Sequence, residues 1–126
     1  MQKSGLAIFL STIWVSICEV FRNSFLLHQH WVTHFDGMQQ VFPEQPINGV
    51  VWGIWAFIFS TLIFIINQRF SFWETVGLAW VIGFVSMWLV IGNLGVLPLS
   101  ILPFAIPLSM VEVIGAVWIY TKFNKS

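Results

Sequence analysis

The stretch from residue 75 to residue 111 contains no charged side chain. A membrane-spanning helix needs roughly 20 apolar residues, so this stretch is too long for one span and suits two. A Gly-Asn-Leu-Gly sequence at residues 92–95 lies near its middle, and glycines favour the tight connection of an antiparallel helical hairpin. The sequence therefore predicts two spans here, over residues 72–91 and 96–120.

Two more apolar stretches, residues 5–27 and 47–66, complete a set of four predicted spans. The chain is 58% hydrophobic and 8% charged, whereas a soluble domain carries about 25% charged residues. Such a chain could not cover its surface with charge in water, so we expect the lipid bilayer to be its solvent. The predicted fold is all-α: a polytopic integral membrane protein whose four transmembrane helices form one bundle over residues 1–126. The net charge is zero and no basic run occurs, which argues against nucleic acid as a partner.

The longest polar connection, residues 28–46, separates the first two spans. Gly37, Pro43 and Pro46 interrupt helix there. Four large apolar residues nevertheless recur at helix-like spacing: Trp31, Phe35, Met38 and Phe42. This pattern predicts a short amphipathic helix on the membrane surface within an outer loop.

The positions of the basic residues predict the orientation of the protein in a cell membrane. With four spans, both chain ends lie on one side together with the turn after the second span. That side collects four basic residues: Lys3, Arg69, Lys122 and Lys125. The opposite side has only Arg22. Because cytoplasmic loops carry the excess of Lys and Arg, we expect a multi-pass protein with cytoplasmic N- and C-termini and the 28–46 loop outside.

The first span carries an unusual polar stripe. Six residues fall within about 60° of one line at 100° per residue: Thr12, Ser16, Glu19, Arg22, Asn23 and His30. Lipid cannot satisfy such groups, so we expect the stripe to face the bundle interior or a wet cavity. In the fourth span, Ser109 and Glu112 share a face with small residues, which suits close helix packing.

Glu19, Arg22 and Glu112 form the predicted buried ionisable cluster. Glu19 and Arg22 are three residues apart on one helix and can pair directly, so Glu112 needs another partner or a proton. Helix rise places the two glutamates at depths that differ by roughly 10 Å. One interpretation is a proton- or cation-linked binding site formed with Asn23 and Ser109. The other is a structural ion pair that orients the first helix, with Glu112 held as a neutral acid by Ser109 or a carbonyl group.

Three prolines lie in or just before the fourth span. Pro98 can begin a helix, whereas Pro103 and Pro107 each remove a backbone hydrogen bond and free a carbonyl one turn earlier. We therefore expect a kink or a broken segment next to Glu112. Freed carbonyls at membrane depth can bind a cation or a ligand; a simple bend filled by neighbouring side chains is the alternative.

The histidines at the end of the first span are candidate zinc ligands. His30 and His34 share a helix face, as two ligands of one ion would, and His28 lies beside them. Asp36 or Glu44 could supply a further ligand. The alternative is a set of ordinary histidines at the membrane interface, and no other cofactor is predicted.

A glutamate within the first span of a four-span chain of this length resembles the small multidrug resistance transporters. That resemblance implies a dimer that exchanges protons for organic cations, with Glu19 as the exchanging carboxylate. It also implies an aromatic-lined pocket, for which four residues are available: Trp14, Trp52, Trp55 and Trp80. Arg22, the long histidine-bearing loop and the prolines depart from that family's pattern, so we assign no family from these few residues.

The residues therefore predict a small transporter- or channel-like protein that uses the Glu19–Arg22–Glu112 cluster. Because one copy leaves little room for a pathway, we expect a homo-oligomer or a place in a larger membrane complex. A non-catalytic membrane subunit or assembly factor is the first alternative. A membrane enzyme or metal site on the histidine-bearing loop is the second, and an enzyme is the less expected outcome.

Overall fold

The computed structural model describes residues 2–124 of the chain. The described residues are helical with short connections, and they contain no β-strand. The elements in order are α1 (Gln2–Val20), the π-helical turn η1 (Phe21–Leu26), α2 (His28–Gly37), α3 (Pro46–Asn67), α4 (Phe72–Trp80), the π-helical turn η2 (Val81–Val85), α5 (Ser86–Asn93), the 3-10 turn η3 (Leu99–Ile101) and α6 (Leu102–Asn124). The prediction of an all-α fold is confirmed.

Within the described residues, four helical stretches are long and apolar enough to cross a membrane. They are Ser4–Leu26, Pro46–Asn67, Phe72–Asn93 and Leu99–Phe123. Each corresponds to one of the spans expected from the sequence, with ends displaced by a few residues. The π-helical turns η1 and η2 lie inside the first and third stretches, where an extra residue widens one turn without interrupting the helix.

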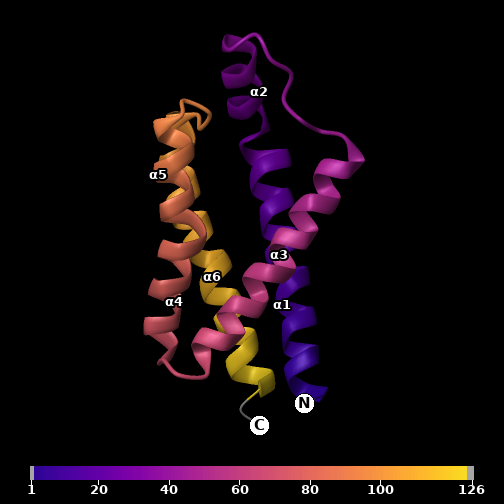
Figure 1. The fold of residues 1–126 in the computed structure, drawn as a ribbon, viewed down its shortest axis with the longest axis vertical. Coiled ribbons are helices and arrows are strands. Elements are labelled where there is room, and N and C mark those ends of the chain that lie inside the picture. Colours follow the sequence, from indigo (N-terminus) through magenta and orange to yellow (C-terminus); the bar gives the residue numbers. More distant parts are fainter. Residues whose placement is uncertain (1, 125–126) are drawn as a thin grey trace.

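The helices pack around a central pair (Figure 1). α1 lies along α6, α3 crosses this pair obliquely, and α4 packs against α6 and the end of α3. α1 begins and α6 ends at the same end of the bundle, and α2 and the α5–α6 connection lie at the other. We call these the terminal end and the α2 end. The α3–α4 turn with Arg69 also lies at the terminal end.

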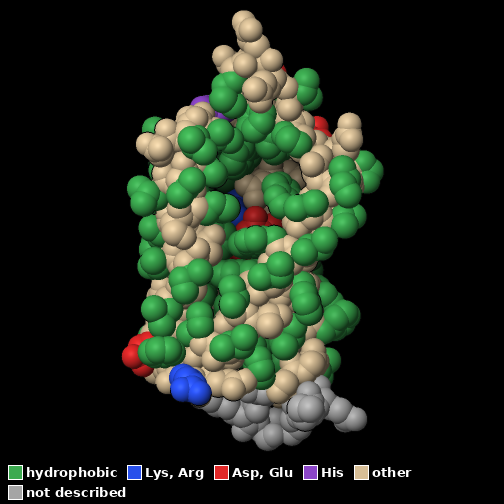
Figure 2. Space-filling view, viewed as in Figure 1, with side chains coloured by type: hydrophobic (Ala, Val, Ile, Leu, Met, Phe, Trp, Pro, Cys, Tyr) green, Lys and Arg blue, Asp and Glu red, His purple; other side chains and the backbone are tan. Residues whose placement is uncertain are grey.

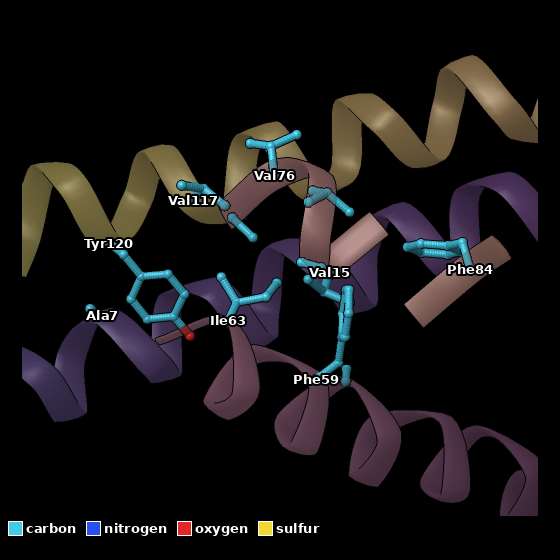
Figure 3. Close-up of a cluster of buried hydrophobic side chains, with 12 residues drawn as sticks. Ala7, Val15, Phe59, Ile63, Val76, Phe84, Val117 and Tyr120 are labelled. Carbon is cyan, nitrogen blue, oxygen red and sulfur yellow. The ribbon is translucent and has the colours of Figure 1, made fainter. Parts of the chain in front are cut away.

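The larger of two hydrophobic clusters fills the terminal half of the bundle, and a smaller one of Leu27, Leu97, Ile101 and Ala105 lies toward the α2 end. The larger cluster joins α1, α3, α4, η2 and α6 through mainly small and β-branched residues with a few aromatic rings (Figure 3). The buried members are Ala7, Val15, Ala56, Phe59, Ile63, Val76, Ala79, Phe84, Val113, Ala116, Val117 and Tyr120. The Tyr120 hydroxyl donates a hydrogen bond to the Ser60 carbonyl, which ties α6 to α3 inside this core.

Two glycines allow aromatic rings to lie directly on helix backbones. A Cβ at Gly115 would stand 2.4 Å from Nε1 of Trp14, and one at Gly83 would stand 2.4 Å from the ring of Phe59. Real Cβ atoms do not approach neighbours so closely, so α1 packs against α6 through the first contact and α3 against η2 through the second. Small residues allow such approach in membrane helices.

A break separates the first span from the 28–46 connection. Leu27 (φ −111°, ψ 8°) lies between η1 and α2, so the polar stripe predicted from Thr12 to His30 does not follow one continuous helix. α2 lies within the segment predicted as a short amphipathic helix, and its contact with a membrane surface stays a prediction. Trp31 stacks on Phe42 of the returning chain at 5.7 Å, and Phe35 meets the same ring edge-on at 5.2 Å. α2 extends the line of α1 at the α2 end (Figure 1).

The prolines do not break α6, which runs from Leu102 to Asn124, and the expected kink stays a prediction. Pro98 precedes η3, and Pro103 is the second residue of α6, where its missing N–H group would have no partner inside the helix. Pro107 lies inside α6 on an exposed face, so its lost hydrogen bond does not open the helix toward Glu112.

Orientation in the membrane remains a prediction. Arg69 follows α3 and Lys122 lies in the last turn of α6, so both stand at the terminal end. The side chain of Lys3 and all of Lys125 lie outside the described part of the chain.

Candidate functional site

Arg22 lies at the centre of the candidate site. Its Nη2 donates to Oε1 of Glu19 at 2.6 Å, and its Nη1 donates to Oε1 of Glu112 at 3.0 Å. The guanidinium therefore bridges both glutamates, whereas the sequence predicted a pair of Arg22 with Glu19 and a separate partner or a proton for Glu112. Helical side chains lean toward the N-terminus of their helix, so Arg22 reaches back along α1 to the level of Glu112. All three residues are buried.

Asn23 completes the environment of Glu19. Its Nδ2 donates to Oε2 of Glu19 at 3.0 Å and to the Glu19 backbone carbonyl at 3.2 Å. Its Oδ1 accepts a hydrogen bond from Nε1 of Trp31 in α2 at 3.0 Å. Both carboxylate oxygens of Glu19 are thus paired, and the cluster is tied directly to α2. The widened turn η1 carries Arg22 and Asn23 as its two buried residues.

Only one of the two carboxylate oxygens of Glu112 has a hydrogen-bond partner. Oε1 pairs with Arg22, whereas Oε2 is buried and has no hydrogen-bond partner. Nε1 of Trp14 donates to the Glu112 backbone carbonyl at 2.8 Å, so α1 holds this turn of α6 in place without contacting the second carboxylate oxygen. Ser109 does not supply the missing partner: its hydroxyl donates to the Ile106 carbonyl and accepts from Nε1 of Trp80, both at 2.9 Å.

The charges of the cluster do not cancel when all three groups are ionised. Two carboxylates face one guanidinium, which leaves one net negative charge in a buried position. An uncompensated buried charge costs several kcal/mol, and it is normally removed by a proton or by a cation. The unpaired Oε2 of Glu112 is the atom with free capacity for that proton.

A cavity of about 190 Å³ reaches this cluster from the side of the molecule. Glu19, Arg22 and Asn23 form its polar base. Three indole rings also line it: Trp31, Trp52 and Trp88. Figure 2 shows the hollow in the half of the molecule nearer α2, between α3 and α5, with acidic and basic atoms at its base.

The cavity is closed toward the terminal end. Ser11, Val15, Ala116 and Val117 lie on α1 and α6 beyond the cluster, and all are fully buried. The Ser11 hydroxyl donates to the Ala116 carbonyl at 3.4 Å, so it forms part of the α1–α6 packing. In this conformation the cluster is therefore reached from the half of the bundle nearer α2.

The three histidines point to different partners. His28 contacts Glu44, Nδ1 of His30 lies 2.9 Å from the Ser100 hydroxyl, and Nε2 of His34 donates to the Gly95 carbonyl at 2.7 Å. Within residues 2–124, no three His, Cys, Asp or Glu side chains gather closely enough to hold a metal ion. His30 and His34 instead fasten α2 to the α5–α6 connection, and the zinc site remains a prediction.

Three tryptophans line the cavity, and only one of them was expected in a pocket. Trp52 is among the residues available for the aromatic-lined pocket that the family resemblance implies, whereas Trp31 and Trp88 are not. Trp14, with its bond to the Glu112 carbonyl, is a further supporting residue. In the sequence, the signal for such residues is a tryptophan three or four residues from a small or an ionisable residue. That signal does not distinguish a tryptophan of the site from any other.

Comparison of the chain with protein-family models, with curated proteins and with solved structures finds no match. The cluster, its cavity and its surroundings are therefore the basis for a functional assignment.

Proposed function

We propose that this protein is a small membrane transporter in which the Glu19–Arg22–Glu112 cluster takes up one proton or one cation through the side cavity. The observation that carries the proposal is the unpaired, buried Oε2 of Glu112 in a cluster with one surplus negative charge. Ionisable groups inside membrane spans are costly, and they commonly mark ion or proton pathways. The side cavity ends on Glu19, Arg22 and Asn23, and Arg22 connects this base to Glu112 behind it.

The residues have distinct roles in this proposal. Glu112 is the group that gains and loses the proton. Arg22 is the counter-ion of both glutamates: it is shared while Glu112 is ionised, and it pairs with Glu19 alone once Glu112 is neutral. Glu19 and Asn23 line the cavity and contact whatever enters it. A change at Glu112 therefore reaches the cavity through the position of the Arg22 guanidinium.

A complete transport cycle also requires access from the terminal end, where the core is tightly packed around Tyr120. Rocking of α1 against α6, or assembly of two copies around a shared path, would provide it. We expect a homo-oligomer for this reason.

Proton-linked flux into proteoliposomes tests the proposal. Vesicles that contain a pH-sensitive dye are given a panel of organic cations, and the wild type is compared with Glu112→Gln. The amide keeps the shape of the carboxyl group but cannot exchange a proton, so flux should fall to the level of empty vesicles. Glu74→Gln is the matched control, because Glu74 is an exposed residue at the start of α4 that glutamine can replace in its capping role. Equal flux in the wild type and Glu112→Gln, at background or above it, would contradict the proposal.

A second function, a non-catalytic membrane subunit, is favoured by one observation. The cluster joins α1 to α6, the two helices that already pack most extensively, and Trp14 adds a further bond between them. Under this function, the double substitution Glu19→Gln/Arg22→Gln lowers stability and weakens co-purification with a larger complex, and no variant changes proton flux. Purification from native membranes together with the flux measurement separates the two functions.

A further inference from the structure

Two buried side-chain atoms in the described part of the chain have no hydrogen-bond partner: Oε2 of Glu112 and Oγ of Ser60. The proposed function uses the first and leaves the second unexplained. Ser60 lies on α3 in the terminal half of the bundle, and its side chain is fully buried. A buried polar atom without a partner costs free energy, so its presence in this core calls for an explanation.

Ser60 belongs to a group of three hydroxyls that come from three different helices. The ring of Tyr120 extends from α6 toward α3, and its hydroxyl donates a hydrogen bond to the Ser60 backbone carbonyl (Figure 3). The side-chain hydroxyls of Ser11, on α1, and of Ser60 both lie next to the Tyr120 hydroxyl. All three residues are fully buried in the described structure. We call them the hydroxyl cluster.

The hydroxyl cluster lies between Glu112 and the terminal end. Ser11 donates to the carbonyl of Ala116, which is one turn beyond Glu112 on α6, or about 6 Å along the helix axis. Asn67 lies two turns beyond Ser60 on α3, and its Oδ1 accepts a hydrogen bond at 3.3 Å from the first turn of α4. Buried polar groups therefore follow one another from the level of Glu112 to the α3–α4 turn.

We infer that Ser11, Ser60 and Tyr120 form the terminal-end part of the proton path, through which Glu112 exchanges its proton with water at that end. This inference rests on the proposed function, and it assigns residues to the half of the bundle that the side cavity does not reach. Hydroxyl groups suit the task because each one both donates and accepts hydrogen bonds. A proton passes when each hydroxyl oxygen accepts one proton and releases its own, so no hydroxyl keeps a charge.

The path is closed in this conformation. Val15 is fully buried on α1, one turn from Ser11 on the side nearer the ion cluster, so apolar packing separates the two polar regions. The movement of α1 against α6 that transport requires opens this contact and admits water. Glu112 then gives its proton to the chain of hydroxyls and water, and it becomes a carboxylate that Arg22 compensates. Water at the terminal end receives the last proton. Ser60 Oγ is available as a relay because no hydrogen bond holds it.

Ser60→Ala tests the inference in the proteoliposome assay of proton flux. The substitution removes an oxygen that makes no hydrogen bond, so the midpoint of thermal unfolding should stay the same or rise. Proton flux should nevertheless fall at least about tenfold, because a positioned proton-transfer group contributes about a hundredfold or more and water replaces a missing hydroxyl only in part. Thr61→Ala is the matched control. Its hydroxyl bonds to the Phe57 carbonyl within α3, and its flux should equal that of the wild type.

Two further measurements separate a proton path from an effect on packing. Tyr120→Phe keeps the ring and removes the hydroxyl, so flux should fall as it does in Ser60→Ala. Infrared difference spectroscopy follows the protonation of Glu112 through its carboxyl C=O stretching band as the pH changes. The titration of this band should be the same in Ser60→Ala and in the wild type, because a relay changes the rate of proton exchange and leaves the equilibrium at Glu112 unaltered.

Wild-type flux in both Ser60→Ala and Tyr120→Phe would overturn the inference. A loss of flux in Ser60→Ala together with a shifted titration of Glu112 would also overturn it, because the substitution would then act on the proton site itself. In both cases, loss of flux in Glu112→Gln would still support the proposed function. Equal flux in the wild type and Glu112→Gln would instead contradict the proposed function, and the inference with it, so the two failures are distinguishable.

Discussion

Substitution of Arg22 and of Glu112 should have very different effects on stability, although the two residues form one ion pair. Arg22→Met keeps an unbranched, flexible side chain of somewhat shorter length but removes the cation from the cluster. At 2.6 and 3.0 Å, the two pairs have Coulomb energies of about 6.4 and 5.5 kcal/mol at an effective dielectric constant near 20. Without Arg22, the two carboxylates can take up protons, which limits the loss of stability. Breaking a buried ion pair by removing one partner typically costs about 3–5 kcal/mol. We expect Arg22→Met to lower the free energy of unfolding by that amount.

Glu112→Gln should cost about 1 kcal/mol or less, close to the value of one ordinary hydrogen bond. The amide oxygen still accepts the hydrogen bond from Nη1 of Arg22, and the surplus negative charge disappears. What remains is the balanced pair of Glu19 and Arg22. The amide NH2 group takes the place of the unpaired Oε2, and its burial is the source of the remaining cost.

Reversible unfolding in mixed micelles, followed by far-ultraviolet circular dichroism, measures both changes. Glu74→Gln again serves as the control for an exposed glutamate. If Glu112→Gln were as destabilising as Arg22→Met, Glu112 would be ionised and fully compensated. The argument from surplus charge would then fail, and the proposed proton site would fail with it.

Two more substitutions test the packing around the site. Gly115→Ala should destabilise the protein by about 1–3 kcal/mol, because its Cβ would overlap the ring of Trp14. Gly77→Ala, with open space around the new Cβ, should stabilise the protein by about 0.5–1 kcal/mol. Thermal unfolding measures both changes, and a more stable Gly115→Ala than Gly77→Ala variant would contradict the structure. Trp31→Phe keeps an aromatic wall but removes the donor to Asn23, so it should cost about 0.5–1.5 kcal/mol and make the amides of α2 exchange faster with deuterium. Unchanged exchange in α2 would show that this hydrogen bond does not hold the helix.

The spans were predictable because each depends on a local property of the chain. A run of apolar residues of sufficient length identifies a membrane helix wherever it occurs, and the Gly-Asn-Leu-Gly connection at residues 92–95 marks the hairpin for equally local reasons. In the structure, Gly95 has a positive φ of 76°, a conformation that glycine adopts without strain.

The shared use of Arg22 was not predictable in the same way. It depends on how far α1 and α6 are shifted along each other and on the direction in which a long side chain leans, and neither follows from a single helix. Pro103 and Pro107 illustrate the same limit. A proline removes a hydrogen bond, but its effect depends on whether it lies in the first turn, as Pro103 does, or on an exposed face, as Pro107 does.

The widened turn η1 makes the length of this segment more important than its composition. In it, Leu27 N–H bonds to the Arg22 carbonyl at 2.8 Å, five residues back rather than four. Deletion of one residue between Phe21 and Leu26 would restore ordinary helical bonding, yet it would turn everything beyond by about 100° around the helix axis. Trp31 would then no longer donate its hydrogen bond to Asn23. Related sequences should accordingly keep the length of this turn, and exchange residues in it mainly outside the buried pair Arg22 and Asn23.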